Sequence, residues 1–184
     1  MSPSPSPSDP ATVAASKPRW RRWIVEIALF LLALLAIQFW QTRLVPEGPA
    51  PAFTARLVDG STITLDAWLG RHPGQPVALY FWADWCPVCK VQEGSIESLR
   101  QDWPVLTVAM QSGNAEQVAQ LLRQRHLAWP TALDERGELA RAYGLQGVPA
   151  LIVVDARGRL RSAAVGYSTA WGMRLRLWWA GFAT

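Results

Sequence analysis

Two cysteines carry the most reactive side chains of this chain, and they lie two residues apart in the segment FWADWCPVCK, residues 81–90. These are Cys86 and Cys89, and the sequence holds no other cysteine. Three kinds of chemistry use such a pair: metal binding, a structural disulfide, and redox exchange between a dithiol and a disulfide. The spacing alone leaves all three open.

The rest of the sequence bears on these alternatives. A disulfide between Cys86 and Cys89 closes a very small loop, so it constrains the unfolded chain little and stabilises the fold little. Copper and zinc sites commonly add histidine to cysteine, but the two histidines, His72 and His126, have no ligand spacing to the cysteines. Two thiolates alone can hold Cu(I), so a Cu(I)-binding metallochaperone module stays as the alternative to redox exchange.

A strand and a helix must position the two cysteines. Residues 76–82, PVALYFW, form the compact apolar run of a buried strand, and residues 87–100 are predicted to be helical, with Pro87 in the first turn. Cys86 then lies at the helix N-terminus, where free N–H groups and the helix dipole stabilise a thiolate. Cys89 lies one turn further on and is more enclosed. We therefore expect Cys86 to attack a disulfide and Cys89 to resolve the mixed disulfide.

The surrounding sequence alternates between strand and helix patterns. Asp59-Gly60 indicates a β-hairpin, residues 104–110 a second buried strand, and Arg157-Gly158 a second hairpin. Further helices are predicted over 115–126, 138–144 and 169–182, and the strands of the second hairpin over 149–155 and 159–167. This order predicts an α/β fold with a mixed sheet, helices on both faces and an N-terminal β-hairpin.

The N-terminal part differs in composition from the rest. Residues 1–22 begin with alternating serine and proline, which predicts a disordered tail. Residues 23–40 are almost continuously apolar, and we predict that they form a single uncleaved transmembrane helix. Residues 41–51 hold three prolines and predict a semi-rigid spacer, so the folded domain is expected over residues 52–184.

The distribution of charge predicts how the chain is oriented. Four basic residues precede the apolar segment: Lys17, Arg19, Arg21 and Arg22. The positive-inside rule then places the N-terminus in the cytoplasm and everything after residue 40 on the other side of the membrane. Residues 43–184 carry 14 basic and 12 acidic side chains. That balance argues against the basic face of a nucleic-acid-binding protein.

Two segments resemble parts of a known superfamily. VALYFWADWCPVCK resembles the active-site strand, turn and helix of the thioredoxin superfamily. GVPALIVVD, residues 147–155, resembles the segment that carries the cis-proline of that superfamily. The lead-in PAFTARLVDGSTITLDAWLG and the predicted anchor narrow the resemblance to membrane-anchored, TlpA-like thiol–disulfide oxidoreductases of the bacterial periplasm. This group includes cytochrome c maturation and copper-tolerance thioredoxin-like proteins.

The resemblance implies a thioredoxin-like fold for the mixed sheet and its helices, and it implies roles for individual residues. Cys86 is the nucleophile and Cys89 the resolving thiol. Val148 and Pro149 form a cis peptide bond that faces them, and Val148 pairs with the extended substrate chain as a β-strand does. The expected apolar contact surface around the dithiol comprises Trp82, Trp85, Pro87 and Val88.

The proton-handling group departs from the pattern of these families. Thioredoxin carries a buried aspartate six residues before its first active-site cysteine, where this chain has Tyr80. TlpA-like proteins often carry a glutamate three residues after the second cysteine, where this chain has Gln92. Glu93 follows directly and is the candidate for proton handling. Beyond the redox-active disulfide, we expect no cofactor and no metal.

We therefore expect the protein to be a periplasmic, membrane-tethered protein-disulfide oxidoreductase. Its partners would be proteins with disulfides or thiols and a membrane electron donor that reduces it again, in the bacterial inner membrane. Peroxidase chemistry on the peroxiredoxin plan needs a threonine three residues before the reactive cysteine, and Ala83 holds that position. Reductase, oxidase and isomerase share these residues; the family favours reduction, but the direction of exchange stays open at this point.

Overall fold

The computed structural model describes residues 19–42, 46 and 48–182. The chain divides into two compact units, residues 1–36 and 37–184. Helix α1 (Arg19–Thr42) contains the predicted anchor, although the side chains at 34, 35 and 37–40 lie outside the described set. The predicted tail also lies largely outside it. Among the described residues, no helix combines the length and the apolar character needed to cross a membrane.

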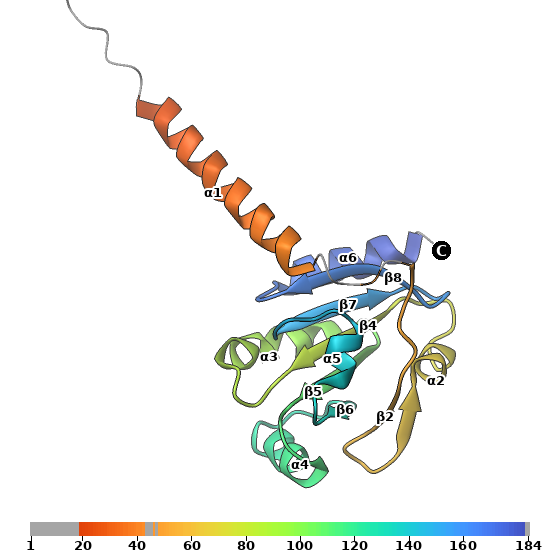
Figure 1. Ribbon diagram of the computed structural model, residues 1–184. Coiled ribbons are helices and arrows are strands. Elements are labelled where there is room, and N and C mark those ends of the chain that lie inside the picture. The colour runs from red at the N-terminus through yellow and green to blue at the C-terminus, as the bar shows by residue number, and fades with distance from the viewer. Residues whose placement is uncertain (1–18, 43–45, 47, 183–184) are drawn as a thin grey trace, which may run out of the picture. The chain divides into compact units, whose positions relative to one another are not determined.

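The second unit is built around a six-stranded mixed sheet with the strand order β1-β8-β7-β4-β5-β6 (Figure 1). Strands β4, β5 and β6 run parallel, whereas β7 pairs antiparallel with β4, β8 with β7, and β1 with β8. The strand bounds are β1 Gly48–Pro49, β4 Val77–Trp82, β5 Val105–Met110, β6 Thr131–Asp134, β7 Ala150–Val154 and β8 Arg159–Val165. The predicted mixed sheet is therefore confirmed.

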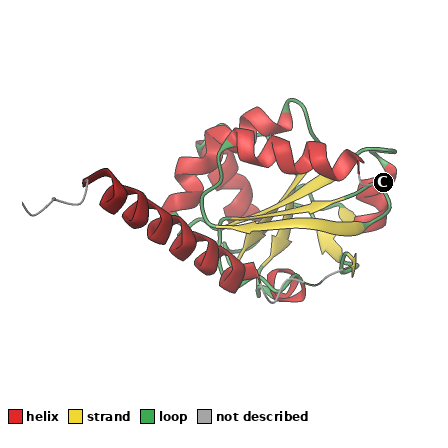
Figure 2. Cartoon of the chain, turned by 90° about the horizontal axis from the view of Figure 1, so that it is seen from above, coloured by secondary structure: helices red, strands yellow, loops and turns green. Residues whose placement is uncertain are grey.

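Helices cover both faces of this sheet (Figure 2). One hydrophobic core joins it to α3 (Pro87–Arg100), α4 (Ala115–Gln124) and α6 (Ala170–Phe182). The other core includes α2 (Leu65–Gly70), α5 (Glu138–Ala142) and the hairpin of β2 (Thr54–Arg56) and β3 (Thr62–Thr64). Strand β4 is central: Tyr80 and Trp82 belong to the first core and Leu79 and Phe81 to the second. Its continuous apolar sequence follows from burial on both faces.

The N-terminal edge of the domain differs from the prediction. Gly48 and Pro49 already pair with β8, and the Ala50 N–H donates to the carbonyl of Gly158 at 2.8 Å. The Tyr143 hydroxyl donates to the carbonyl of Pro51 at 2.8 Å. The end of the predicted spacer 41–51 is therefore part of the sheet, because its backbone finds partners far along the chain. Strands β1 and β6 and helix α2 were not predicted, since each is too short to show a periodic pattern.

Candidate active site

The two cysteines lie where β4 gives way to α3. Cys86 is the N-cap of α3, and Pro87 occupies the first turn of the helix. Cys86 and Cys89 form a disulfide with their Cα atoms 5.3 Å apart. Their side chains are buried, and the backbone N–H of Cys89 donates to Sγ of Cys86 at 3.1 Å. A thiolate on Cys86 in the reduced state would sit at the positive end of a 14-residue helix, which stabilises negative charge there.

The loop that contains Val148 and Pro149 lies next to Cys86, although it is distant from Cys86 in the sequence. The Val148–Pro149 peptide bond is cis, which confirms that prediction. The carbonyl oxygen of Val148 lies 3.6 Å from Sγ of Cys86. The loop is held in the sheet because the Gly166 N–H donates to the carbonyl of Pro149 at 2.8 Å. The structure thus brings Cys86, Cys89, Val148 and Pro149 together, as the resemblance implied.

Exposed apolar side chains lie next to the two cysteines in the sequence. Trp85 is 58% exposed and Val88 43% exposed, and Pro87 is also exposed. Val91, one turn further along α3, is 73% exposed and was not predicted to take part. We call Trp85, Pro87, Val88 and Val91 the dithiol rim.

The expectation that Trp82 contributes to the exposed contact surface is wrong. Its side chain is 2% exposed and packs edge-on against Trp129, with the ring centroids 5.9 Å apart. Trp82 is the last residue of the central strand, where both faces of the sheet are covered. The chain turns outward only after Ala83, so Trp85 is exposed while Trp82 is part of the core.

The region expected to handle protons contains a buried tyrosine and an ion pair. Tyr80 is fully buried, and burial together with the negative charge of Glu93 raises the pKa of its hydroxyl far above the usual value. Glu93 itself accepts a hydrogen bond from Arg125 at 2.6 Å. Gln92 is buried and accepts the N–H of Ser168 at 3.1 Å, which links α3 to the segment before α6. A proton-handling role for Glu93 stays a prediction.

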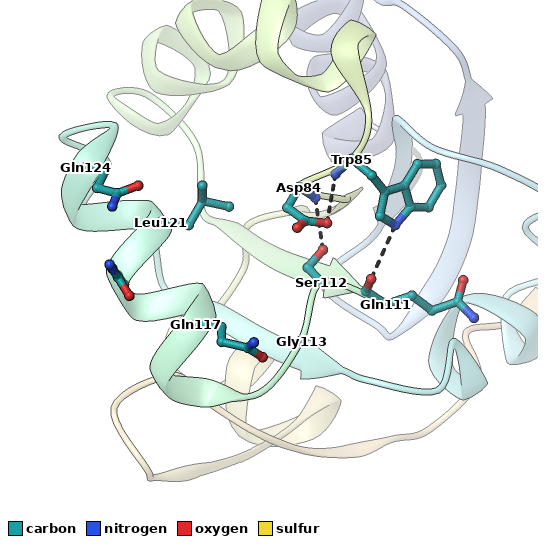
Figure 3. A pocket seen from close by; sticks show the side chains of 9 residues that line it. Asp84, Trp85, Gln111, Ser112, Gly113, Gln117, Leu121 and Gln124 are labelled. Atoms are coloured by element: carbon teal, nitrogen blue, oxygen red, sulfur yellow. Dashed lines mark hydrogen bonds between the residues drawn. The ribbon is translucent and has the colours of Figure 1, made fainter.

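A polar pocket of about 490 Å³ lies beside the dithiol rim (Figure 3). Asp84 and Trp85 line one side, and Gln117, Gln120 and Gln124 of α4 line the other. The backbone N–H of Asp84 donates to Oγ of Ser112 at 3.0 Å. The Trp85 indole N–H donates to the carbonyl of Gln111 at 3.2 Å. These contacts fix the loop before the cysteines.

Sequence reasoning missed Gln111 and Ser112. Gln111 has a left-handed backbone with φ of 47°, which aims its carbonyl at Trp85. A signal for this contact was available: both residues follow the strand predicted over 104–110, and the C-terminal ends of adjacent parallel strands meet at one edge of the sheet. Within the described residues, no three histidine, cysteine or acidic side chains cluster in a way that could hold a metal ion.

Comparison with known proteins agrees with this geometry. Residues 46–163 match the model of the AhpC/TSA family. The chain belongs to this family. A thioredoxin-like protein of Haemophilus influenzae is 27% identical over 154 residues, which cover 83% of this chain and 89% of that protein. Sporulation thiol-disulfide oxidoreductase A of Bacillus subtilis is 28% identical over 156 residues, covering 80% of this chain and 92% of that protein.

A solved structure supports the predicted thioredoxin-like fold. The crystal structure of StoA from Bacillus subtilis superposes with a TM-score of 0.56 and 25% sequence identity. The match covers 70% of this chain and 96% of that one. This member of the AhpC/TSA family thus has a thioredoxin-like α/β fold with a CxxC disulfide at the N-terminus of α3.

Proposed function

We propose that this protein is a thiol–disulfide oxidoreductase that reduces disulfides in partner proteins through Cys86 and Cys89. One observation carries the proposal: Sγ of Cys86 caps α3 and lies 3.6 Å from the carbonyl of Val148, beside the cis Pro149. This arrangement favours a thiolate on Cys86 and places the backbone of the half-buried Val148 beside it. An extended substrate chain would pair with Val148 and rest on the dithiol rim.

The exchange takes place in two steps. In the reduced protein, the Cys86 thiolate attacks one sulfur of the substrate disulfide. A bond forms between Cys86 and that sulfur, the substrate S–S bond breaks, and the second substrate sulfur leaves as a thiolate that takes a proton from water. Cys89 then gives its proton to the hydroxide left in the solvent and attacks Sγ of Cys86, which closes the Cys86–Cys89 disulfide and releases the first substrate sulfur as a thiolate. Two electrons pass to the substrate, and a donor of two electrons must restore the dithiol.

Membrane anchoring by residues 23–40 is part of the proposal. The described apolar side chains of α1 are exposed, among them Trp23, Ile27 and Phe30. The basic residues before this segment favour a cytoplasmic N-terminus, with the domain in the periplasm and the segment in the bacterial inner membrane. Carbonate extraction of membranes tests the anchor: the protein should stay in the pellet, and removal of residues 23–40 should release it.

The direction of electron flow is tested in cells. We propose reduction of partner proteins, with a membrane electron donor that keeps the dithiol reduced. Thiols are trapped by acid and alkylated, and the shift in mass reports whether Cys86 and Cys89 are free. The reductase proposal requires a mostly reduced pair that becomes oxidised when the donor is removed. A pair that is oxidised in both situations would exclude the reductase direction.

A further inference from the structure

The C-terminal helix α6 is apolar on two opposite faces. Met173, Leu177 and Ala180 are buried in the core against the sheet and α3. The other face exposes between 51% and 81% of five large apolar side chains: Trp171, Leu175, Trp178, Trp179 and Phe182. We call these five residues the α6 face. Their spacing of four, three, one and three residues places them on one side of the helix. Exposed apolar patches of this kind mark sites of association.

Arginines outnumber acidic groups around the α6 face. Residues 156–184 contain five arginines and no acidic residue, although Arg174 pairs with Asp102 and Arg161 with Asp155. Arg176 of α6 donates to the hydroxyl of Ser162 on β8 at 2.7 Å. Arg161, Arg176, Trp178 and Trp179 together line a hollow of about 510 Å³ between these elements. The charge beside the α6 face is therefore positive on balance, with Arg176 bound to a neutral hydroxyl, and such a surface attracts anions.

A short stretch of sequence joins the segment proposed as the anchor to the sheet edge beside α6. Strand β1 pairs with β8, with Gly48 opposite Leu160. Strand β8 in turn contacts α6 (Figure 1). Only residues 43–47 separate the end of α1 from β1. At about 3.6 Å per residue in a fully extended chain, this connection can reach no further than about 20 Å. An anchored chain thus holds the β8 edge, and the elements next to it, near the bilayer surface.

We propose that the α6 face docks onto the headgroup region of an anionic phospholipid bilayer. Tryptophan is enriched at this interface, because its ring is apolar and its indole N–H is polar. A helix with tryptophan and leucine on one side and flanking arginines has the composition of an interfacial helix. Anionic lipids add attraction for the surrounding arginines. The proposal rests on the tether of the proposed function for its proximity to the bilayer, not on the dithiol chemistry.

Docking would also fix the position of the dithiol above the membrane. The segment just before α6 is joined to α3, since Ser168 donates its N–H to Gln92, three residues after Cys89. With α6 seated on the lipid surface, the dithiol end of the domain is held at a constant height. A membrane-embedded electron donor would then meet the disulfide in one orientation.

The test uses the full-length protein labelled with 5-fluorotryptophan in nanodiscs that contain phosphatidylglycerol and a headgroup spin label. The fluorine signals are assigned by single Trp→Phe substitutions. We expect the signals of Trp171, Trp178 and Trp179 to broaden several-fold more than that of Trp85. Trp85 is the internal control, because it is exposed to a similar degree on the same domain.

A pair of charge variants sharpens the test. Arg176→Gln removes a cation beside the α6 face, and Arg123→Gln removes an exposed cation from α4. The first should reduce the broadening at Trp178 and Trp179, and replacement of phosphatidylglycerol by phosphatidylcholine should do the same. The second should leave the broadening unchanged.

Two results would overturn the docking proposal. The first is equal broadening of the α6 signals and the Trp85 signal. The second is protection of the α6 signals from a soluble paramagnetic agent without broadening by the lipid label, which would mean that α1 or a second copy of the chain covers the face. Trp20 and Trp23 report the tether separately: if their signals do not broaden, the anchor of the proposed function fails, whatever α6 does. Reduction of a soluble disulfide substrate, measured in parallel, tests the dithiol on its own.

Discussion

The dithiol rim and the α6 face both expose tryptophan, yet they are built differently. At the rim, the indole of Trp85 is tied to the carbonyl of Gln111, and the adjacent Cys86 receives the N–H of Cys89. On α6, Trp178 packs edge-on against its neighbour Phe182, with the ring centroids 4.4 Å apart. The rim thus presents one defined group beside a reactive sulfur. The α6 face presents a broad apolar stripe among arginines.

This difference shows how one domain can separate recognition of a polypeptide from contact with a surface. A reactive dithiol needs fixed neighbours, because the attacking sulfur must approach a disulfide in line with its bond. Contact with a lipid surface needs only apolar area and charge of the right sign. A substitution in one region should therefore leave the other region intact.

The largest effect is expected from the nucleophile. Cys86→Ser should abolish reduction of a soluble disulfide substrate such as insulin, because a hydroxyl at this position cannot form the mixed disulfide. Trp179→Ser, on the α6 face, should leave this activity unchanged. The assay is turbidity of insulin with dithiothreitol as the electron source. Loss of activity in Trp179→Ser would mean that the α6 face also contributes to reduction of the soluble substrate, contrary to the separation of the two regions.

The second largest effect separates the two tryptophans of the FWADW segment. Trp82→Ala should lower the free energy of unfolding by about 3–5 kcal/mol, because it opens a cavity in the core against Trp129. Trp85→Ala should lower it by less than about 1 kcal/mol, since the side chain is exposed, but should weaken substrate reduction. Urea unfolding measures both. A similar stability loss in the two variants would mean that Trp85 belongs to the core.

A smaller effect is expected on the pH dependence of stability. It involves Asp155, in the β7–β8 hairpin that leads to the α6 face. Burial opposes the charge of Asp155, but the N–H groups of Arg159 and Arg157 and the side chain of Arg161 outweigh it and hold its pKa below the usual value. A lowered pKa means that the carboxylate stabilises the fold above the unfolded-state pKa of about 3.9 and that this contribution is lost as pH falls through the lower native pKa.

Asp155→Asn should therefore lower the free energy of unfolding at pH 7 by about 1–3 kcal/mol, the cost of buried donors left without a good acceptor. The difference from the unmodified protein should shrink below pH 4. Thermal unfolding at a series of pH values measures it. A difference that stays constant from pH 7 to pH 3 would show that the carboxylate charge contributes nothing.

The smallest effect is expected at Gln111, whose φ of 47° is left-handed. Gln111→Gly relieves this conformation but loosens the unfolded chain, so the free energy of unfolding should change by less than about 1 kcal/mol. The contact with Trp85 uses the backbone carbonyl and should persist, visible as an unchanged Trp85 fluorine signal. A shifted signal would assign the contact to the side chain of Gln111 instead.

The sequence predicted those parts of the site that depend on local patterns. The apolar run before Cys86, the helix that starts at Pro87 and the proline at 149 all carry their signals within a few residues. Long-range contacts were harder to predict. Pairing of Gly48 with Leu160 depends on strand order, and the burial of Trp82 depends on Trp129, 47 positions away. The left-handed backbone of Gln111 could not be predicted either, since no glycine stands at that position to indicate it.

We propose that Cys86 attacks the substrate and that Cys89 resolves the mixed disulfide. A comparison of Cys89→Ala with Cys86→Ala tests this division of roles, with each variant expressed in full length and recovered by non-reducing electrophoresis and mass spectrometry. We expect Cys89→Ala to accumulate mixed disulfides to partner proteins through Cys86, and Cys86→Ala to accumulate almost none. Mixed disulfides formed mainly through Cys89, or none in either variant, would contradict it.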